Sequence, residues 1–167
     1  MKKVLITGWS HGLGMALTKA LLAKNIPVIG LSRTSMDLPI IFYPIDFEKD
    51  DIPTVVASII KQHPDIDVLI NNAGVYEYGP LEQNRLEQIH KVTQVNIEAV
   101  MEMTYSLLPT IKNNRGDVVN IGSTAAYQGV AKHAVYCASK WALKGFTQSL
   151  QEELKDDPVR ILGIHPG

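Results

Sequence analysis

Tyr136 and Lys140 have the residue types and the spacing that proton transfer requires. They stand four positions apart in a segment with helical periodicity, so their side chains emerge on the same face of a helix. A phenol with its ordinary pKa of ~10 is a poor base at neutral pH, whereas an ammonium beside it favours the phenolate. The pair therefore predicts a tyrosine that donates or accepts a proton. Taken alone, an exposed aromatic side chain and a solvated lysine would be the better interpretation.

Ser123 adds a third polar group, because it directly follows the β-branched segment Val118–Gly122. In parallel sheets, ligands bind at the carboxyl ends of the strands. A hydroxyl there can donate a hydrogen bond to the carbonyl or hydroxyl oxygen of a substrate. Together the three residues favour chemistry at such an oxygen over the bland interpretation of each residue alone.

A glycine-rich turn near the N-terminus predicts a phosphate-binding site. The predicted strand Val4–Thr7 runs straight into Gly8-x-x-x-Gly12-x-Gly14, and helical periodicity begins at once. Glycines at such a turn permit a tight bend, close approach of backbone to a pyrophosphate, and tight packing of helix on strand. A plain strand-to-helix loop is the alternative, because a glycine-rich turn alone is weak evidence.

Short β-branched segments alternate with longer helical ones, which predicts one doubly wound α/β domain over residues 1–167, with a parallel Rossmann-like sheet. The predicted strands are Val4–Thr7, Val28–Ser32, Ile40–Asp46, Val68–Asn71, Val118–Gly122 and Ile161–Ile164. The predicted helices are Gly12–Lys24, Pro53–Gln62, Asn84–Lys112 and Val135–Lys155.

Five motifs in this order resemble the short-chain dehydrogenase/reductase family, and the resemblance covers essentially the whole chain. They are the glycine turn Thr7–Gly14, similar to TGxxxGxG, then Asn71-Asn72-Ala73-Gly74, similar to NNAG, then Asn96, Ser123, and Tyr136-x-x-x-Lys140, similar to YxxxK. The resemblance implies hydride transfer between a nicotinamide dinucleotide and a small carbonyl or alcohol substrate, with Tyr136 as general acid or base. It further implies that Lys140 holds the nicotinamide ribose and that Asn96 helps to order a water relay behind Lys140.

The same resemblance predicts which residues bind the dinucleotide. These are Gly8, Ser10, Gly12, Leu13, Gly14, Ser32, Arg33, Asp46, Asn72, Ala73, Gly74, Tyr136 and Lys140. Asp46 matches a family position that contacts the adenine, but a lone aspartate could equally cap a helix or turn. Asn72 and Gly74 follow the fourth strand, which is expected beside the first where strand order reverses, so we expect both residues in the cofactor crevice. A polar turn is the alternative.

The end of the second strand bears on which dinucleotide binds. NAD sites usually place an acidic residue ~20 positions after the glycine turn, and arginine is common where a 2′-phosphate must be bound. Here Ser32 takes the acidic position and Arg33 follows it, as in the NADP-using members, while Asp37 lies five residues beyond the strand. NADP is therefore favoured over NAD. A solvated loop arginine is the alternative for Arg33.

Composition argues against several other classes of protein. The 16 Lys and Arg and 17 Asp and Glu residues are interspersed and give a formal net charge of -1, which offers no basic face for nucleic acid. No apolar run approaches the ~18 residues of a membrane span, and no signal peptide is predicted. A single cysteine, Cys137, and five scattered histidines predict no disulfide and no metal site, in keeping with a reducing cytoplasm.

Assembly and chain length are also predicted from the resemblance. The long helix and the helix that carries Tyr136 correspond to two that, in the family, form a four-helix bundle between subunits. Apolar residues on more than one face, including Met101, Met103, Trp141 and Phe146, predict a homodimer or homotetramer. Family members continue past Gly167 through a substrate loop, a helix and a seventh strand. We therefore expect the functional protein to be longer than 167 residues, and the 167-residue chain alone to bind the adenine half of the cofactor but to reduce carbonyls poorly. A non-catalytic NADP-binding or interaction protein is the alternative function.

Overall fold

The computed structural model describes residues 2–167, and its six strands form one parallel sheet. The strands are β1 (Lys3–Thr7), β2 (Val28–Ser32), β3 (Ile41–Pro44), β4 (Ile66–Asn71), β5 (Asp117–Ile121) and β6 (Arg160–Ile164). Their order is β3-β2-β1-β4-β5-β6, and every neighbouring pair is parallel. The strand order thus reverses between β1 and β4, which confirms the doubly wound sheet and brings the glycine turn beside the segment after β4.

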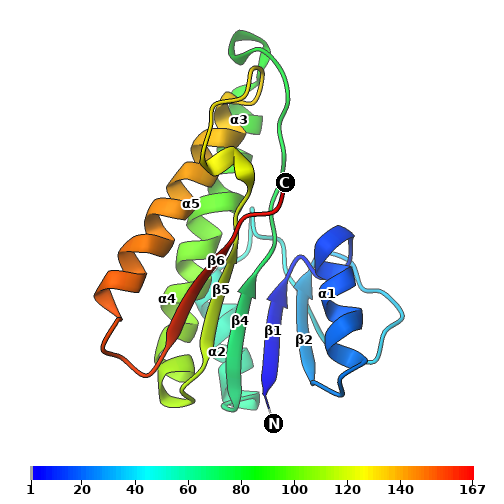
Figure 1. Cartoon of the computed structure of the whole chain (residues 1–167). Coiled ribbons are helices and arrows are strands. Elements are labelled where there is room, and N and C mark those ends of the chain that lie inside the picture. The colour runs from blue at the N-terminus through cyan, green and yellow to red at the C-terminus, as the bar shows by residue number, and fades with distance from the viewer. Residues whose placement is uncertain (1) are drawn as a thin grey trace.

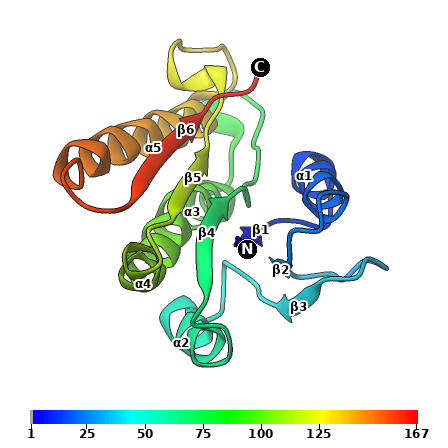
Figure 2. The same ribbon diagram turned by 60° about the horizontal axis from the view of Figure 1, so that its bottom comes forward.

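Helices cover both faces of the sheet, with α1 on one face and α2, α4 and α5 on the other (Figures 1 and 2). The helices are α1 (Gly12–Leu22), α2 (Ile52–Gln62), α3 (Leu86–Thr93), α4 (Ala99–Asn113) and α5 (Ala134–Glu153), with short 3₁₀ turns η1 (Leu81–Gln83) and η3 (Thr124–Ala126) and a π-helical segment η2 (Gln94–Glu98). At the start of α2, the Asp51 carboxylate accepts the N–H of Thr54, and Pro53 needs no partner there.

Each face of the sheet packs on its own apolar core, because successive side chains of a strand point to opposite faces. In β1, Val4 and Ile6 join the core under α1, and Leu5 joins the larger core under α2 and α4. Trp9, from the glycine turn, is fully buried in the α1 core and packs edge-on against Phe42 at 5.9 Å between ring centroids.

The predicted single helix over residues 84–112 is wrong in two respects. It begins at Leu86, and residues 94–98 form the π-helical segment η2 before α4 continues. A π turn adds one residue within the helix, which shifts the side chains after it, and such turns are common at functional sites. Asn96 lies in this segment. The third strand is also shorter than predicted, since β3 ends at Pro44.

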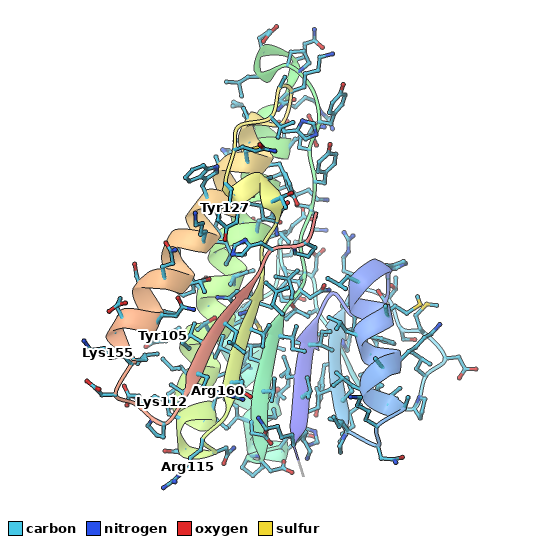
Figure 3. All side chains as sticks on the ribbon, in the orientation of Figure 1. Tyr105, Lys112, Arg115, Tyr127, Lys155 and Arg160 are labelled. Atoms are coloured by element: carbon cyan, nitrogen blue, oxygen red, sulfur yellow. The ribbon has the colours of Figure 1, made fainter. Side chains whose placement is uncertain are left out.

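The apolar residues that predicted contact between subunits divide between core and surface. Met103 is 1% exposed and belongs to the core under α4. The other apolar residues of the set lie on more exposed faces of the two helices. Met101 and Trp141 are exposed and Phe146 is half-buried. Tyr105 on α4 and Tyr127, just after η3, are also exposed (Figure 3).

Among residues 2–167, the helices are all too short or too polar to cross a membrane.

Candidate active site

The glycine turn between β1 and α1 is built around close backbone contacts. Gly8 has a φ of +65°, a conformation that side chains with a Cβ rarely adopt. A Cβ on Gly14 would lie 2.2 Å from the carbonyl oxygen of Gly8, so only glycine fits. The Asn72 amide donates to the carbonyl oxygens of Thr7 and Gly8, both at 3.0 Å, and so fixes the turn against the segment after β4.

A cavity of about 400 Å³ opens beside this turn. Eleven of the residues predicted to bind the dinucleotide line it: Gly8, Ser10, Gly12, Leu13, Gly14, Ser32, Arg33, Asp46, Asn72, Ala73 and Gly74. The other two predicted residues, Tyr136 and Lys140, do not line it. Bare backbone at the glycine turn, a helix N-terminus and a crevice at the reversal of strand order suit a dinucleotide phosphate.

The end of β2 brings one cation to the cavity. Ser32 is buried, and its hydroxyl donates to the carbonyl oxygen of Thr34 at 2.6 Å. The side chain of Arg33 is 62% exposed, and its Nη1 atom lies 3.8 Å from Oε1 of Glu48. Arg33 is therefore an exposed residue that lines the cavity and has a weak contact with one acidic side chain.

Asp46 caps a turn and also lines the cavity. Its Oδ1 atom accepts the backbone N–H of Glu48 at 3.1 Å, which is the capping role left open by the sequence. Its position in the cavity wall is compatible with the other role, contact with a ligand.

Lys140 is buried rather than solvated, with 6% of its surface exposed. Its ammonium donates to the carbonyl oxygen of Ile121 at 3.1 Å and lies 5.7 Å from the ring centroid of Tyr136. Burial disfavours the charged form and lowers the pKa of Lys140 from 10.5 to about 8. A Cβ on Gly74 would lie 3.8 Å from Nζ, which places the ammonium next to the cavity wall at Gly74.

Asn96 connects the segment after β4 to α5. Its Oδ1 accepts the N–H of Val75 at 2.8 Å, and its Nδ2 donates to the carbonyl oxygen of Val75 at 2.9 Å. Nδ2 also donates to Ser139 Oγ at 3.0 Å, and that hydroxyl donates to the carbonyl oxygen of Tyr136 at 2.7 Å. The π segment thus supplies an amide that fixes the backbone at Tyr136 relative to the cavity wall.

Ser123 follows β5, as expected, and begins the short turn η3. Its Oγ accepts the N–H of Ala125 at 3.1 Å, which occupies an oxygen lone pair and leaves the hydroxyl proton for another acceptor. Ser123 lies two residues after Ile121, whose carbonyl oxygen accepts from Lys140. The carboxyl end of β5 therefore carries both the serine and the carbonyl that holds the lysine.

The sequence of residues 2–167 matches the short chain dehydrogenase family. The chain belongs to this family. It is 34% identical to the ketoacyl reductase HetN of Nostoc sp. over 99% of this chain and 63% of that protein. It is likewise 34% identical to an NADP-dependent 3-hydroxy acid dehydrogenase of Schizosaccharomyces pombe, over 99% of this chain and 71% of that protein. The chain therefore spans less than two thirds of the length of the Nostoc relative.

The fold agrees with solved structures of the family. A metagenomic short-chain oxidoreductase in complex with NADP superimposes with a TM-score of 0.91 at 29% identity, over 99% of this chain and 81% of that one. The predicted family membership is confirmed, and with it the Rossmann-like sheet.

Sequence reasoning missed several residues of this short-chain dehydrogenase that surround Tyr136. The ring of Tyr76 packs edge-on against Tyr136, with 5.0 Å between centroids. The Tyr76 hydroxyl forms a hydrogen bond with Nε2 of His133, and Tyr78 packs on the same histidine. From sequence, His133 has the character of an ordinary loop histidine, and its neighbours lie more than fifty positions away in the chain. No local pattern signals contacts of that kind.

Proposed function

We propose that this short-chain dehydrogenase interconverts a small carbonyl compound and its alcohol with NADP(H), and that Tyr136 is the general acid or base. The observation that carries the proposal is the buried ammonium of Lys140, which lies beside both the Tyr136 ring and the cavity wall at Gly74. A buried cation at that place stabilises negative charge that develops on the phenol oxygen as its proton is transferred.

Each of the four polar residues then has a distinct task. NADPH, when bound, supplies the hydride for the substrate carbonyl carbon. Tyr136 gives its proton to the substrate oxygen, and the Lys140 ammonium stabilises the phenolate that remains. Ser123 donates a hydrogen bond to the same oxygen. Asn96 holds Val75 and, through Ser139, the backbone of Tyr136. By the family resemblance, it also helps to order water behind Lys140.

The preference for NADP over NAD rests on the end of β2. Ser32 carries no negative charge where NAD sites usually have an acid, and Arg33 lines the cavity rim next to it. The NADP-dependent relative and the NADP-bound structure support this choice. Their names also suggest where to look for the substrate, because one relative is a 3-hydroxy acid dehydrogenase and another a ketoacyl reductase.

We further propose that the chain assembles as a homodimer or homotetramer in the cytoplasm. The exposed apolar side chains of Met101 and Trp141, from α4 and α5, supply the apolar surface for contact between subunits. Light scattering at working concentration should return a multiple of the subunit mass, and a monomer mass would refute the assembly.

Consumption of NADPH tests the proposed reaction. The whole protein is mixed with NADPH and a panel of aldehydes, ketones and 3-oxo acids, and dinucleotide binding is titrated in parallel. We expect turnover with at least one member of the panel, and NADPH to bind more tightly than NADH. Tight binding of NADPH with no turnover on any carbonyl would favour a non-catalytic NADP-binding protein instead.

A further inference from the structure

A carboxylate stands between two cations at the rim of the dinucleotide cavity. Oε1 of Glu48 lies 2.9 Å from Nζ of Lys91 and 3.8 Å from Nη1 of Arg33. Glu48 and Arg33 both line the cavity, whereas Lys91 reaches Glu48 from α3 and does not line it. The side chain of Glu48 is 26% exposed, against 39% for Lys91 and 62% for Arg33, so water screens the carboxylate less than the two cations.

The position of Glu48 is fixed by its backbone. Its N–H donates to Asp46 Oδ1 at 3.1 Å, and its carbonyl oxygen accepts from Nε2 of Gln94 at 2.9 Å. Gln94 and Lys91 are three residues apart where α3 passes into the π segment, so both contact Glu48 from the same side. The carboxylate is therefore held at the cavity rim by the segment that also carries Asn96.

A carboxylate at this place weakens the binding of an anionic ligand. A carboxylate beside Arg33 cancels part of the guanidinium charge and repels a phosphate that approaches it. The shorter of its two ion pairs is the one with Lys91, which draws the carboxylate charge away from Arg33. With Lys91 present the three side chains carry a net charge of +1, and without it the net charge is zero.

We propose that Glu48 and Lys91 set how strongly this protein prefers NADP to NAD. Glu48 weakens the hold of Arg33 on the 2′-phosphate, and Lys91 acts as a positioning residue that limits this effect by pairing with Glu48. The uncharged 2′-hydroxyl of NAD responds little to either residue. This inference deepens the proposed function, because it requires that Arg33 contact the 2′-phosphate.

The test compares the two adenine-half fragments, 2′,5′-ADP and 5′-AMP, by calorimetric titration of the whole protein. Glu48→Gln should tighten 2′,5′-ADP roughly two- to fivefold, the scale of a partly exposed charge contact, and leave the affinity for 5′-AMP almost unchanged. Lys91→Met should weaken 2′,5′-ADP by a similar factor. In the Glu48→Gln background, Lys91→Met should have almost no effect, because the carboxylate through which it acts is gone.

Lys49→Met is the matched control. It removes the same charge from the residue next to Glu48, but its ammonium contacts Asp46, at 3.6 Å, rather than Glu48. Its effect on 2′,5′-ADP should be the same in the wild-type protein and in the Glu48→Gln background. Equal changes for both fragments in Lys91→Met, or a Lys91→Met effect that persists in Glu48→Gln, would overturn the inference.

Arg33→Ala separates this failure from a failure of the proposed function. If Arg33→Ala weakens 2′,5′-ADP selectively but Glu48→Gln changes nothing, only the role of Glu48 and Lys91 is wrong. If Arg33→Ala also changes nothing, the preference for NADP assigned to Arg33 is wrong, and the inference fails with it.

Discussion

The Lys140 ammonium lies 5.7 Å from the ring centroid of Tyr136 and donates its hydrogen bond to the carbonyl oxygen of Ile121, and within residues 2–167 no carboxylate pairs with it. Burying a cation whose hydrogen-bond acceptor is a single carbonyl oxygen lowers the free energy of unfolding. This cost gives Lys140 a signature in stability that is separate from its role in activity.

Lys140→Met should therefore stabilise the protein while lowering activity. The folded-state pKa of about 8 lies below the ordinary 10.5, so the folded protein disfavours the proton that the unfolded chain binds. The destabilisation caused by the buried charge is fully present below pH 8 and is absent above pH 10.5. The stability of the wild type therefore rises relative to that of the variant as the pH increases between these values. We expect the variant to be more stable by ~1–3 kcal/mol at pH 7. Urea unfolding at pH 7 and pH 10 measures the difference, and a difference independent of pH would contradict the burial argument.

Arg33→Ala tests the choice of dinucleotide. A charge-assisted contact between guanidinium and phosphate contributes ~1.5–3 kcal/mol, so the variant should bind NADPH roughly 10- to 100-fold more weakly. Affinity for NADH should be almost unchanged, because NADH has no 2′-phosphate. Fluorescence titration with both dinucleotides measures the two affinities. Equal losses for both, or none, would show that Arg33 does not bind the 2′-phosphate.

Gly14→Ala tests whether the glycine turn requires a residue without a Cβ at this position. A Cβ there would meet backbone, 2.2 Å from the Gly8 carbonyl oxygen, so no side-chain rotation relieves the clash. We expect the free energy of unfolding to fall by about 1–3 kcal/mol and dinucleotide binding to be lost. Gly145→Ala in α5 is the control, because a Cβ there has no neighbour within 4 Å. The free energy of unfolding of the control should rise by about 0.5–1 kcal/mol, since alanine favours a helix. Thermal unfolding measures both variants, and an equal loss of stability in the two would contradict the need for a bare backbone at Gly14.

Asp117, at the start of β5, binds Arg160 at the start of β6 and Lys2 just before β1. These contacts lie at the end of the sheet opposite the cavity. Burial of its carboxylate raises the pKa, but hydrogen bonds from Arg160 and Lys2 outweigh this and lower the pKa from its ordinary value of 3.8. Figure 3 labels Arg160 at the start of β6, next to β5. The stabilisation is present above pH 3.8 and is lost as the pH falls through the depressed folded-state value.

Asp117→Asn should therefore be less stable than the wild type at pH 7, and the difference should shrink in acid. Denaturant unfolding at pH 7 and at about pH 3 measures it. A difference that grows as the pH falls would show that the carboxylate does not stabilise the sheet through its charge.

Much of this architecture could be predicted from the chain because it follows local patterns. The alternation of β-branched and helical segments predicts a doubly wound sheet, and the strand order of that sheet puts Gly8 beside Asn72 although they are far apart in sequence. The rule that ligands bind where strand order reverses places the cavity, and the family resemblance supplies the eleven predicted residues that line it.

Other features depend on contacts that no local pattern contains. The π segment at Asn96 keeps helical spacing on both sides, so periodicity does not separate it from an α-helix. Glu48 and Lys91 form an ion pair although they lie 43 positions apart in the sequence. Taken alone, each looks like an ordinary charged residue on a solvated surface.

Removal of a single hydroxyl in Tyr136→Phe tests the central claim most directly. The ring keeps its packing against Tyr76, so the fold and NADPH affinity should stay nearly unchanged. Turnover of the best carbonyl substrate, measured as NADPH consumption by the whole protein, should fall by ~10²-fold or more, the usual scale of a lost general acid. A variant that binds NADPH and turns over like the wild type would contradict the account, because Tyr136 could not then be the residue that protonates the substrate oxygen.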